Sequence, residues 1–261
     1  MRKAPWLAPL FFTIFLLILW QYASSKATLA FWILPSPVNV LKVFGERHQL
    51  IMHHLKPTLI SALSGLLISI VLGSLTAILM DASKLVKQII YPYLVVSQTV
   101  PIIAIAPLII IWFGYGISGK IFTVVLVCFF PIALGLYDGF RQVSVDQTRL
   151  MKALGASGYK TFRYLKLPAA LPGFFTGLKL AATYSVMGAV IGEWLGGSAG
   201  LGIYMTRATK SFQTAQVFAV IITVILLSMG LFGIIAVLDR VFLRWRYQHQ
   251  DEYIEPNSSK G

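Results

Sequence analysis

Acidic residues are scarce in this chain, and the motifs of several enzyme classes are missing. Nine of its 261 residues are Asp or Glu, against 22 Lys and Arg, which gives a net charge of +13. The one cysteine, Cys128, excludes an intrachain disulfide and a metal site built from thiolates. No G-x-x-x-x-G-K-[ST] loop, Ser-His-Asp set or pair of carboxylates is placed for chemistry. We therefore expect no enzyme activity, no bound cofactor and no ATP hydrolysis by this chain alone.

Charged residues of both signs make up only 12% of the chain, whereas 57% of it is hydrophobic. The mean hydropathy of +0.77 argues against a soluble globular protein. The basic residues lie at the ends of apolar runs and form no patch interleaved with aromatic residues, which disfavours nucleic-acid binding. The composition indicates an integral membrane protein.

Six apolar stretches are long enough to cross a hydrocarbon layer of about 30 Å, which takes roughly 20 helical residues. They are residues 5–23, 58–80, 89–113, 119–138, 172–194 and 216–238. The sequence thus predicts one all-α membrane domain over residues 1–261, with a polar loop at 139–171 and a tail at 239–261. We interpret the first stretch as a retained signal anchor, because its apolar core is longer than that of a signal peptide.

The third stretch is irregular. Pro101 and Pro107 each remove a backbone donor, and Gly114 and Gly116 follow them. A kinked or broken helix is expected, and freed carbonyls at membrane depth are tolerated only against protein or a water-filled cavity. Both prolines are therefore candidate walls of a pathway, and a kink that serves only packing explains them equally well.

An even number of spans places both termini on the same side of the membrane. More of the 22 basic residues lie on that side, near the termini and in the 139–171 loop, than on the other. Lys and Arg are enriched on the cytosolic side. The termini and the loop are therefore predicted to be cytosolic, in the cytoplasmic membrane of a bacterium.

The segment between the first two spans is too polar to cross the membrane. Its stretch VNVLKVFGERHQLI predicts an amphipathic helix at the outer surface. His48, His53 and His54 lie in this region, but adjacent histidines do not project to one helix face and no carboxylate or cysteine cluster joins them. We expect surface histidines and no metal site.

Small residues recur every four positions on the second and fifth spans, and four-residue spacing keeps them on one helix face. Gly65 and Gly73 belong to the first stripe, and Gly173 and Gly177 to the second. Such stripes let helices approach closely in lipid, so we predict helix packing faces. Glu193 ends the fifth span and has two interpretations, a structural anchor or a gate of the pathway.

The polar loop carries six basic residues against two acidic ones, Asp138 and Asp146. Leu150 and Leu154 share one helix face, and a similar apolar pair follows after a break at residues 155–158. The pattern predicts two short amphipathic helices.

Ser157 is placed to cap the second of these helices, and Pro168 with Pro172 is expected to end it.

One spacing in the loop resembles a known motif. Gly155 is followed by nine residues, then Leu165, one residue, and Leu167-Pro168. This resembles the loop E-A-A-x-x-x-G-x9-I-x-L-P of permease subunits of ATP-binding-cassette importers. The positions of E-A-A hold Arg149-Leu150-Met151 in this chain.

Other strings extend the resemblance over roughly residues 5–246. LPSP at 34–37, VPIIAIAPLIIIWFGYG at 100–116 and GEWLGGSAGLG at 192–202 resemble the nitrate, sulfonate and taurine branch of that family. The stretch at 177–197 also resembles permeases assigned to pyrimidine precursors of thiamine.

The resemblance implies a type I, MetI-like importer architecture in which the loop supplies a coupling helix. It further implies a homodimer, two separate ATPase subunits that bind the ATP, and an external solute-binding protein. The residues assigned to the ATPase contact are Arg149, Lys152, Leu154, Gly155, Ser157, Gly158, Phe162, Arg163, Leu165, Leu167 and Pro168.

The expected function is uptake of a small nutrient, either sulfonate-, taurine- or nitrate-like or a thiamine pyrimidine precursor. Three alternatives remain: a secondary transporter, an intramembrane enzyme and a membrane scaffold. A secondary transporter should show repeated halves and a charge pair at the membrane midplane, and the sequence has neither. An enzyme needs a nucleophile or metal ligands at depth, and a scaffold does not require the Leu-Pro spacing.

Overall fold

The structure, a computed structural model, describes residues 7–26, 33–194 and 196–245. Its helices are α1 (Leu7–Lys26), α2 (Pro37–Ala82), α3 (Lys84–Ser97), α4 (Ile102–Phe113), α5 (Ile117–Arg141), α6 (Val145–Ala153), α7 (Gly158–Thr161), the π-helical turn η1 (Phe162–Lys166), α8 (Leu167–Trp194), α9 (Leu201–Lys210) and α10 (Thr214–Phe242). The described residues contain no strand, which confirms the all-α prediction. Residues 246–261 of the predicted tail lie outside the described part.

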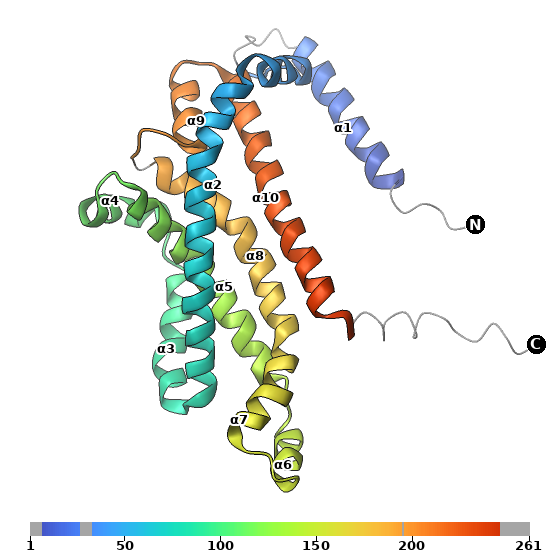
Figure 1. The fold of residues 1–261 in the computed structure, drawn as a ribbon. Coiled ribbons are helices and arrows are strands. Elements are labelled where there is room, and N and C mark those ends of the chain that lie inside the picture. Colours follow the sequence, from blue (N-terminus) through green and yellow to red (C-terminus); the bar gives the residue numbers. More distant parts are fainter. Residues whose placement is uncertain (1–6, 27–32, 195, 246–261) are drawn as a thin grey trace, which may run out of the picture.

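Four long helices, α2, α5, α8 and α10, form the central bundle, and α3 returns beside α2 (Figure 1). The helices α6 and α7 lie at one end of this bundle, and α9 lies at the other (Figure 1). Helix α1 stands apart and meets the rest near its C-terminal end, where Trp20 contacts Phe218. The bundle thus separates two polar ends by an apolar middle.

Glycines set the distance between α5 and α8, the most extensively packed pair. A Cβ added at Gly135 would lie 2.6 Å from the carbonyl oxygen of Gly173. One added at Gly177 would overlap the carbonyl oxygen of Pro131. Such backbone contact provides van der Waals attraction that lipid cannot replace. The predicted stripe on the fifth span therefore packs within this chain.

The stripe on α2 faces α5 in the same way. A Cβ at Gly65 would lie 2.5 Å from Cβ of Val124, and one at Gly73 would lie 3.0 Å from Cγ2 of Ile132. Both glycines are buried. Larger residues at either position would push α2 away from α5.

The third predicted span is two helices. Chain direction changes at residues 98–101, between the end of α3 and the start of α4, which confirms the predicted break. Neither piece is long enough to cross a membrane, so the described residues hold five candidate spans: Leu7–Ser25, α2, α5, Gly158–Trp194 and α10. The third predicted span corresponds to the broken pair α3 and α4, since Pro101 cannot continue the backbone ladder of α3, and the count of six spans stays a prediction.

The fifth predicted span starts earlier than expected. Pro168 and Pro172 do not end a helix, because Gly158–Trp194 runs on as one apolar helical stretch through η1. In this turn the N–H of Leu167 donates to the carbonyl of Phe162, five residues earlier. The wider turn directly precedes Pro168, at the point where a regular helix would meet the proline ring.

The surface helix predicted after the first span is the beginning of α2. It lies across the end of the bundle and turns sharply before the long part of α2 (Figure 1). The turn is at Arg47, whose φ of −115° and ψ of 15° are not helical. Ser36 caps its start by accepting from the N–H of Asn39.

Candidate functional site

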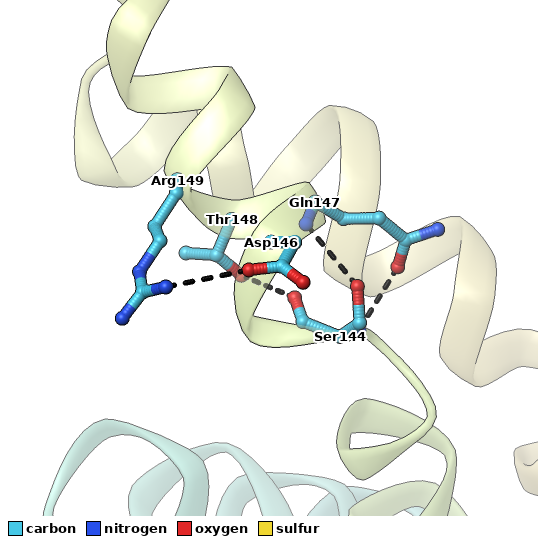
Figure 2. Close-up of polar contacts among 5 residues, drawn as sticks. All are labelled: Ser144, Asp146, Gln147, Thr148 and Arg149. Atoms are coloured by element: carbon cyan, nitrogen blue, oxygen red, sulfur yellow. Dashed lines mark hydrogen bonds and ion pairs between the residues drawn. The ribbon is translucent and has the colours of Figure 1, made fainter.

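The first candidate site is the knob, defined as residues 144–166, which projects beyond the bundle (Figure 1). A capping box begins α6, as Figure 2 shows. The hydroxyl of Ser144 accepts from the backbone N–H of Gln147 at 3.1 Å, and the side-chain Oε1 of Gln147 accepts from the backbone N–H of Ser144 at 2.9 Å. Asp146 in the first turn and Lys152 in the last complement the helix dipole. Local sequence therefore defines α6 without burial in the bundle.

A left-handed residue turns the chain between α6 and α7. Gly155 has φ of +77°, a region that side chains with a Cβ disfavour. The N–H of Ala156 donates to the carbonyl of Met151, which closes the end of α6. Ser157 then caps α7 by accepting from the N–H of Lys160, as predicted. No described atom lies within 4 Å of a Cβ built on Gly155, so the need for glycine here comes from the backbone angle.

Most residues predicted for the ATPase contact lie on the outside of the knob. Leu154 is 75% exposed, and Arg149, Lys152, Gly155, Ser157, Gly158 and Arg163 are also exposed. Arg149, at the position of the motif's glutamate, bonds to Asp146 within α6 at 3.4 Å (Figure 2). The knob therefore presents apolar and basic side chains together.

Phe162 differs from the exposed residues predicted for the ATPase contact. Its ring packs on Phe140 of α5, with centroids 5.6 Å apart, and it adjoins the buried cluster that includes Met80 and Tyr137. Leu165, Leu167 and Pro168 are likewise only partly exposed. The Phe162 ring therefore helps attach the knob to the bundle, and the assignment of Phe162 to the ATPase contact stays a prediction.

An ion pair makes a second attachment of the knob. Nζ of Lys166 in η1 donates to both carboxylate oxygens of Asp81, at 3.0 and 2.9 Å. Asp81 ends α2, and both side chains are mostly buried. The turn that leads into α8 is therefore tied to α2 as well as α5.

The second candidate site lies at the opposite end of the bundle, where the latch loop, defined as residues 196–202, precedes α9. Glu193 at the end of α8 is fully buried. Its Oε1 accepts from the hydroxyl of Thr58 at 2.7 Å, and its Oε2 accepts from the N–H of Gly202 at 2.7 Å. The carboxylate thus satisfies the N-terminus of α9 and joins α2 to α8.

Other side chains from α2 and α5 hold the same loop. Nδ1 of His54 accepts from the N–H of Gly200 at 3.1 Å, so this nitrogen carries no proton. Lys120 donates to the carbonyl of Ala199 at 2.8 Å. His54 also stacks on Tyr204 of α9, with centroids 5.2 Å apart. His54 is buried, so the interpretation of a surface histidine is wrong for this residue.

This packing requires a glycine at position 200. Its φ is +138°, and a Cβ there would collide with the carboxyl group of Glu193. The latch loop is therefore shaped around the buried acid. This geometry makes Glu193 a structural tie between helices, and a role in gating stays a prediction.

The third candidate site is the break between α3 and α4. Pro101 precedes α4 and Pro107 lies inside it. Because proline has no N–H, the carbonyls of Ser97 and Ile103 lose their regular partners four residues later. Pro101 and Pro107 thus lie in the segment of the break, whereas Glu193 belongs to the latch, and a role of the two prolines in a pathway stays a prediction.

Sequence reasoning missed several residues of these sites. The capping box at Ser144 was visible as the S-x-x-Q pattern of residues 144–147. Tyr159 and Tyr164 add exposed aromatic surface to the knob, at 70% and 69% exposure. No local pattern identifies Thr58 or Lys120, because the structure brings them to the latch loop from distant segments.

Comparison with known proteins agrees with this arrangement. Residues 69–244 match the family described as "Binding-protein-dependent transport system inner membrane component". The chain is 38% identical over 241 residues to the formylaminopyrimidine transport permease protein ThiX of Halalkalibacterium halodurans, which covers 92% of this chain and 96% of that protein. It is also 29% identical over 254 residues to the putative aliphatic sulfonates transport permease protein SsuC of Bacillus subtilis. That match covers 95% of this chain and 91% of SsuC.

A solved structure shares the fold. An inward-facing MetNI methionine ABC transporter chain superposes with a TM-score of 0.58 at 17% identity, over 74% of this chain and 94% of that chain. The sequence match and the shared fold have one explanation. The chain belongs to the family of binding-protein-dependent transport system inner membrane components, the membrane permease subunits of ATP-binding-cassette importers.

Proposed function

We propose that two copies of this chain form the substrate pathway of an importer, and that an ATPase subunit docks on the knob of each copy. An external solute-binding protein delivers the nutrient at the opposite end, near the latch loop. The chain itself binds no ATP and no cofactor. In this arrangement both termini are cytosolic, on the same side as the knob.

The observation that carries the proposal is the construction of the knob. Its fold is fixed by its own caps, and its exposed Leu154, Tyr159 and Tyr164 have no covering element in the described residues. Exposed apolar residues rimmed by basic ones are typical of a protein interaction surface. Arg149 and Lys152 favour an acidic rim on the partner.

Movement of the knob can be transmitted to the membrane-spanning helices in two ways. One is covalent, since α7 and η1 continue into α8. The other runs through Phe162 on α5 and through Lys166 on Asp81 of α2. ATP binding and release shift the pathway between two conformations only if the ATPase pair holds the two knobs differently in each state. Rigid attachment at three helices suits that requirement.

The imported compound is a small nutrient. The permease at 38% identity is named for a formylaminopyrimidine, and the one at 29% identity for aliphatic sulfonates. Both classes are therefore candidates for this chain.

The knob is tested with Leu154→Glu in the complex of permease, ATPase subunits and binding protein, reconstituted in liposomes. Because Leu154 is exposed, the variant should insert and fold. We expect loss of ATPase binding or of its stimulation by loaded binding protein. Leu41→Glu, at an exposed position on the surface part of α2, is the matched control. Normal stimulation in the Leu154 variant would contradict docking on the knob.

A further inference from the structure

A cavity of about 360 Å³ lies at the break between α3 and α4, bounded by α5 and α8. Its polar lining comes from Ser97 and Gln98 at the break and from Tyr184 on α8. The other walls are aliphatic side chains and the thioether of Met187. The volume falls within the range of about 300–1,000 Å³ that is usual for small-molecule sites.

The cavity is at membrane depth. Helix α3 has 14 residues and starts at Lys84, next to the polar end that carries the knob. At 1.5 Å per residue it rises about 21 Å, so its last turn lies inside a hydrocarbon layer of about 30 Å. Ser97, Gln98 and Thr99 are exposed on this chain. The hydroxyls of Ser97 and Thr99 donate to the carbonyls of Leu94 and Val96, whereas the side-chain amide of Gln98 has no such partner among the described residues. An unpaired amide facing lipid at that depth would be unfavourable, which indicates that Gln98 faces a pathway containing water.

Hydrogen-bonding groups at the cavity are free to meet a solute. The Gln98 amide and the Tyr184 hydroxyl make no hydrogen bond with any other residue that the structure describes. The Ser97 carbonyl has lost its helical partner, because Pro101 cannot donate. An amide and a phenol each donate and accept, and the carbonyl accepts. The site can therefore bond a solute that carries both kinds of group.

The same lining disfavours one class of candidate substrate, the sulfonates. None of the side chains that line the cavity in the described part of the chain is charged. A sulfonate bound there would exchange part of its water shell for uncharged groups, with no cation in the lining to balance its charge, which is unfavourable. A flat, neutral ring with nitrogen atoms instead finds donors, acceptors, apolar walls and a polarizable sulfur.

We propose that this cavity is a substrate-contacting site of the membrane pathway and that it takes an uncharged nitrogen heteroaromatic compound of the aminopyrimidine kind. This inference rests on the proposed function and narrows its substrate class. Gln98 and Tyr184 are the residues that bond the ring substituents, and the break at Pro101 supplies the free carbonyl.

Water access and occupancy are tested by cysteine labelling. Cys128 is the one cysteine of the chain, so Cys128→Ala gives a background without thiols. In the reconstituted complex, Val100→Cys, at a lining position that makes no proposed bond to the solute, should react with a charged methanethiosulfonate reagent, and formylaminopyrimidine should slow the reaction while taurine does not. Val71→Cys, at an exposed position on α2, is the control that should stay unlabelled.

Absence of labelling at Val100→Cys, with ATP-driven uptake intact, would overturn this inference and leave the proposed function standing. Protection by taurine and not by the pyrimidine would overturn the substrate class. Labelling needs no ATP hydrolysis, so its result is independent of the test of ATPase docking.

Kinetics test the hydrogen bonds. Tyr184→Phe removes one hydroxyl, and loss of one neutral hydrogen bond should raise KM for formylaminopyrimidine about 2- to 10-fold without changing the maximal rate of uptake. Tyr93→Phe makes the same change at an exposed position of α3 outside the cavity lining and should have no effect. Equal KM values for the two variants would contradict a role of Tyr184 in binding.

Discussion

Removal of the Glu193 carboxylate should loosen the latch loop by an amount that depends on the replacement. In Glu193→Ala, the N–H of Gly202 loses its acceptor in a buried position. The hydroxyl of Thr58 can turn to the carbonyl of His54, 3.2 Å away. One orphaned N–H, two lost charge-assisted bonds and the vacated side-chain volume together amount to about 3 to 5 kcal/mol.

Glu193→Gln should cost much less, about 1 kcal/mol, because every partner can be satisfied. The amide oxygen accepts from the N–H of Gly202, and the amide nitrogen donates to the Thr58 oxygen. That oxygen already accepts from the N–H of Leu201 at 2.9 Å, and its proton turns to the His54 carbonyl. Only the charge is lost.

Hydrogen exchange at the amides of Leu201 and Gly202 measures this difference directly. With 1.4 kcal/mol per factor of ten, protection should fall roughly 100- to 4,000-fold in Glu193→Ala and about fivefold in Glu193→Gln. Glu46→Ala, at an exposed acid on the surface part of α2, is the control. Equal protection in the Ala and Gln variants would refute the hydrogen-bond reasoning.

Three further predictions concern the knob and the bundle. Gly155→Leu should retain the fold, with local strain of about 1 to 2 kcal/mol from its φ of +77°, but abolish uptake in transport assays. Gly177→Leu should lower the yield of folded protein in size-exclusion chromatography, whereas Gly233→Leu, where a Cβ meets nothing within 4 Å, should not. Asp81→Lys should reduce the coupling of ATP hydrolysis to uptake, and adding Lys166→Asp should restore part of it; a double variant no better than the single one would contradict the ion pair's role.

The sequence predicted the local features of this protein well, because they depend on neighbouring residues. Hydropathy located the apolar helices, and the cap at Ser157 and the break before Pro101 follow from single-residue chemistry. The same local rule was wrong at Pro168 and Pro172, where a π-turn and packing on α5 let the helix continue.

Contacts between distant segments could not be predicted. Nothing near Glu193 in the sequence indicates that Thr58 donates to it, and no periodicity separates Phe162, which packs inward, from Leu154, which is exposed. The cavity at Gln98 likewise needs α5 and α8 to be placed beside the break. Sequence therefore indicated the elements and the family, whereas pairing of side chains required the fold.

The continuous helical stretch Gly158–Trp194 connects the attachments of the knob at one end with the latch acid at the other. Its 37 residues, at 1.5 Å each, make a rod about 55 Å long. A tilt of about 5° about one end of such a rod displaces the other by about 5 Å, close to the rise of one helical turn. A small rotation imposed beneath the membrane is therefore geometrically sufficient to pull Glu193 away from Thr58 on the far side.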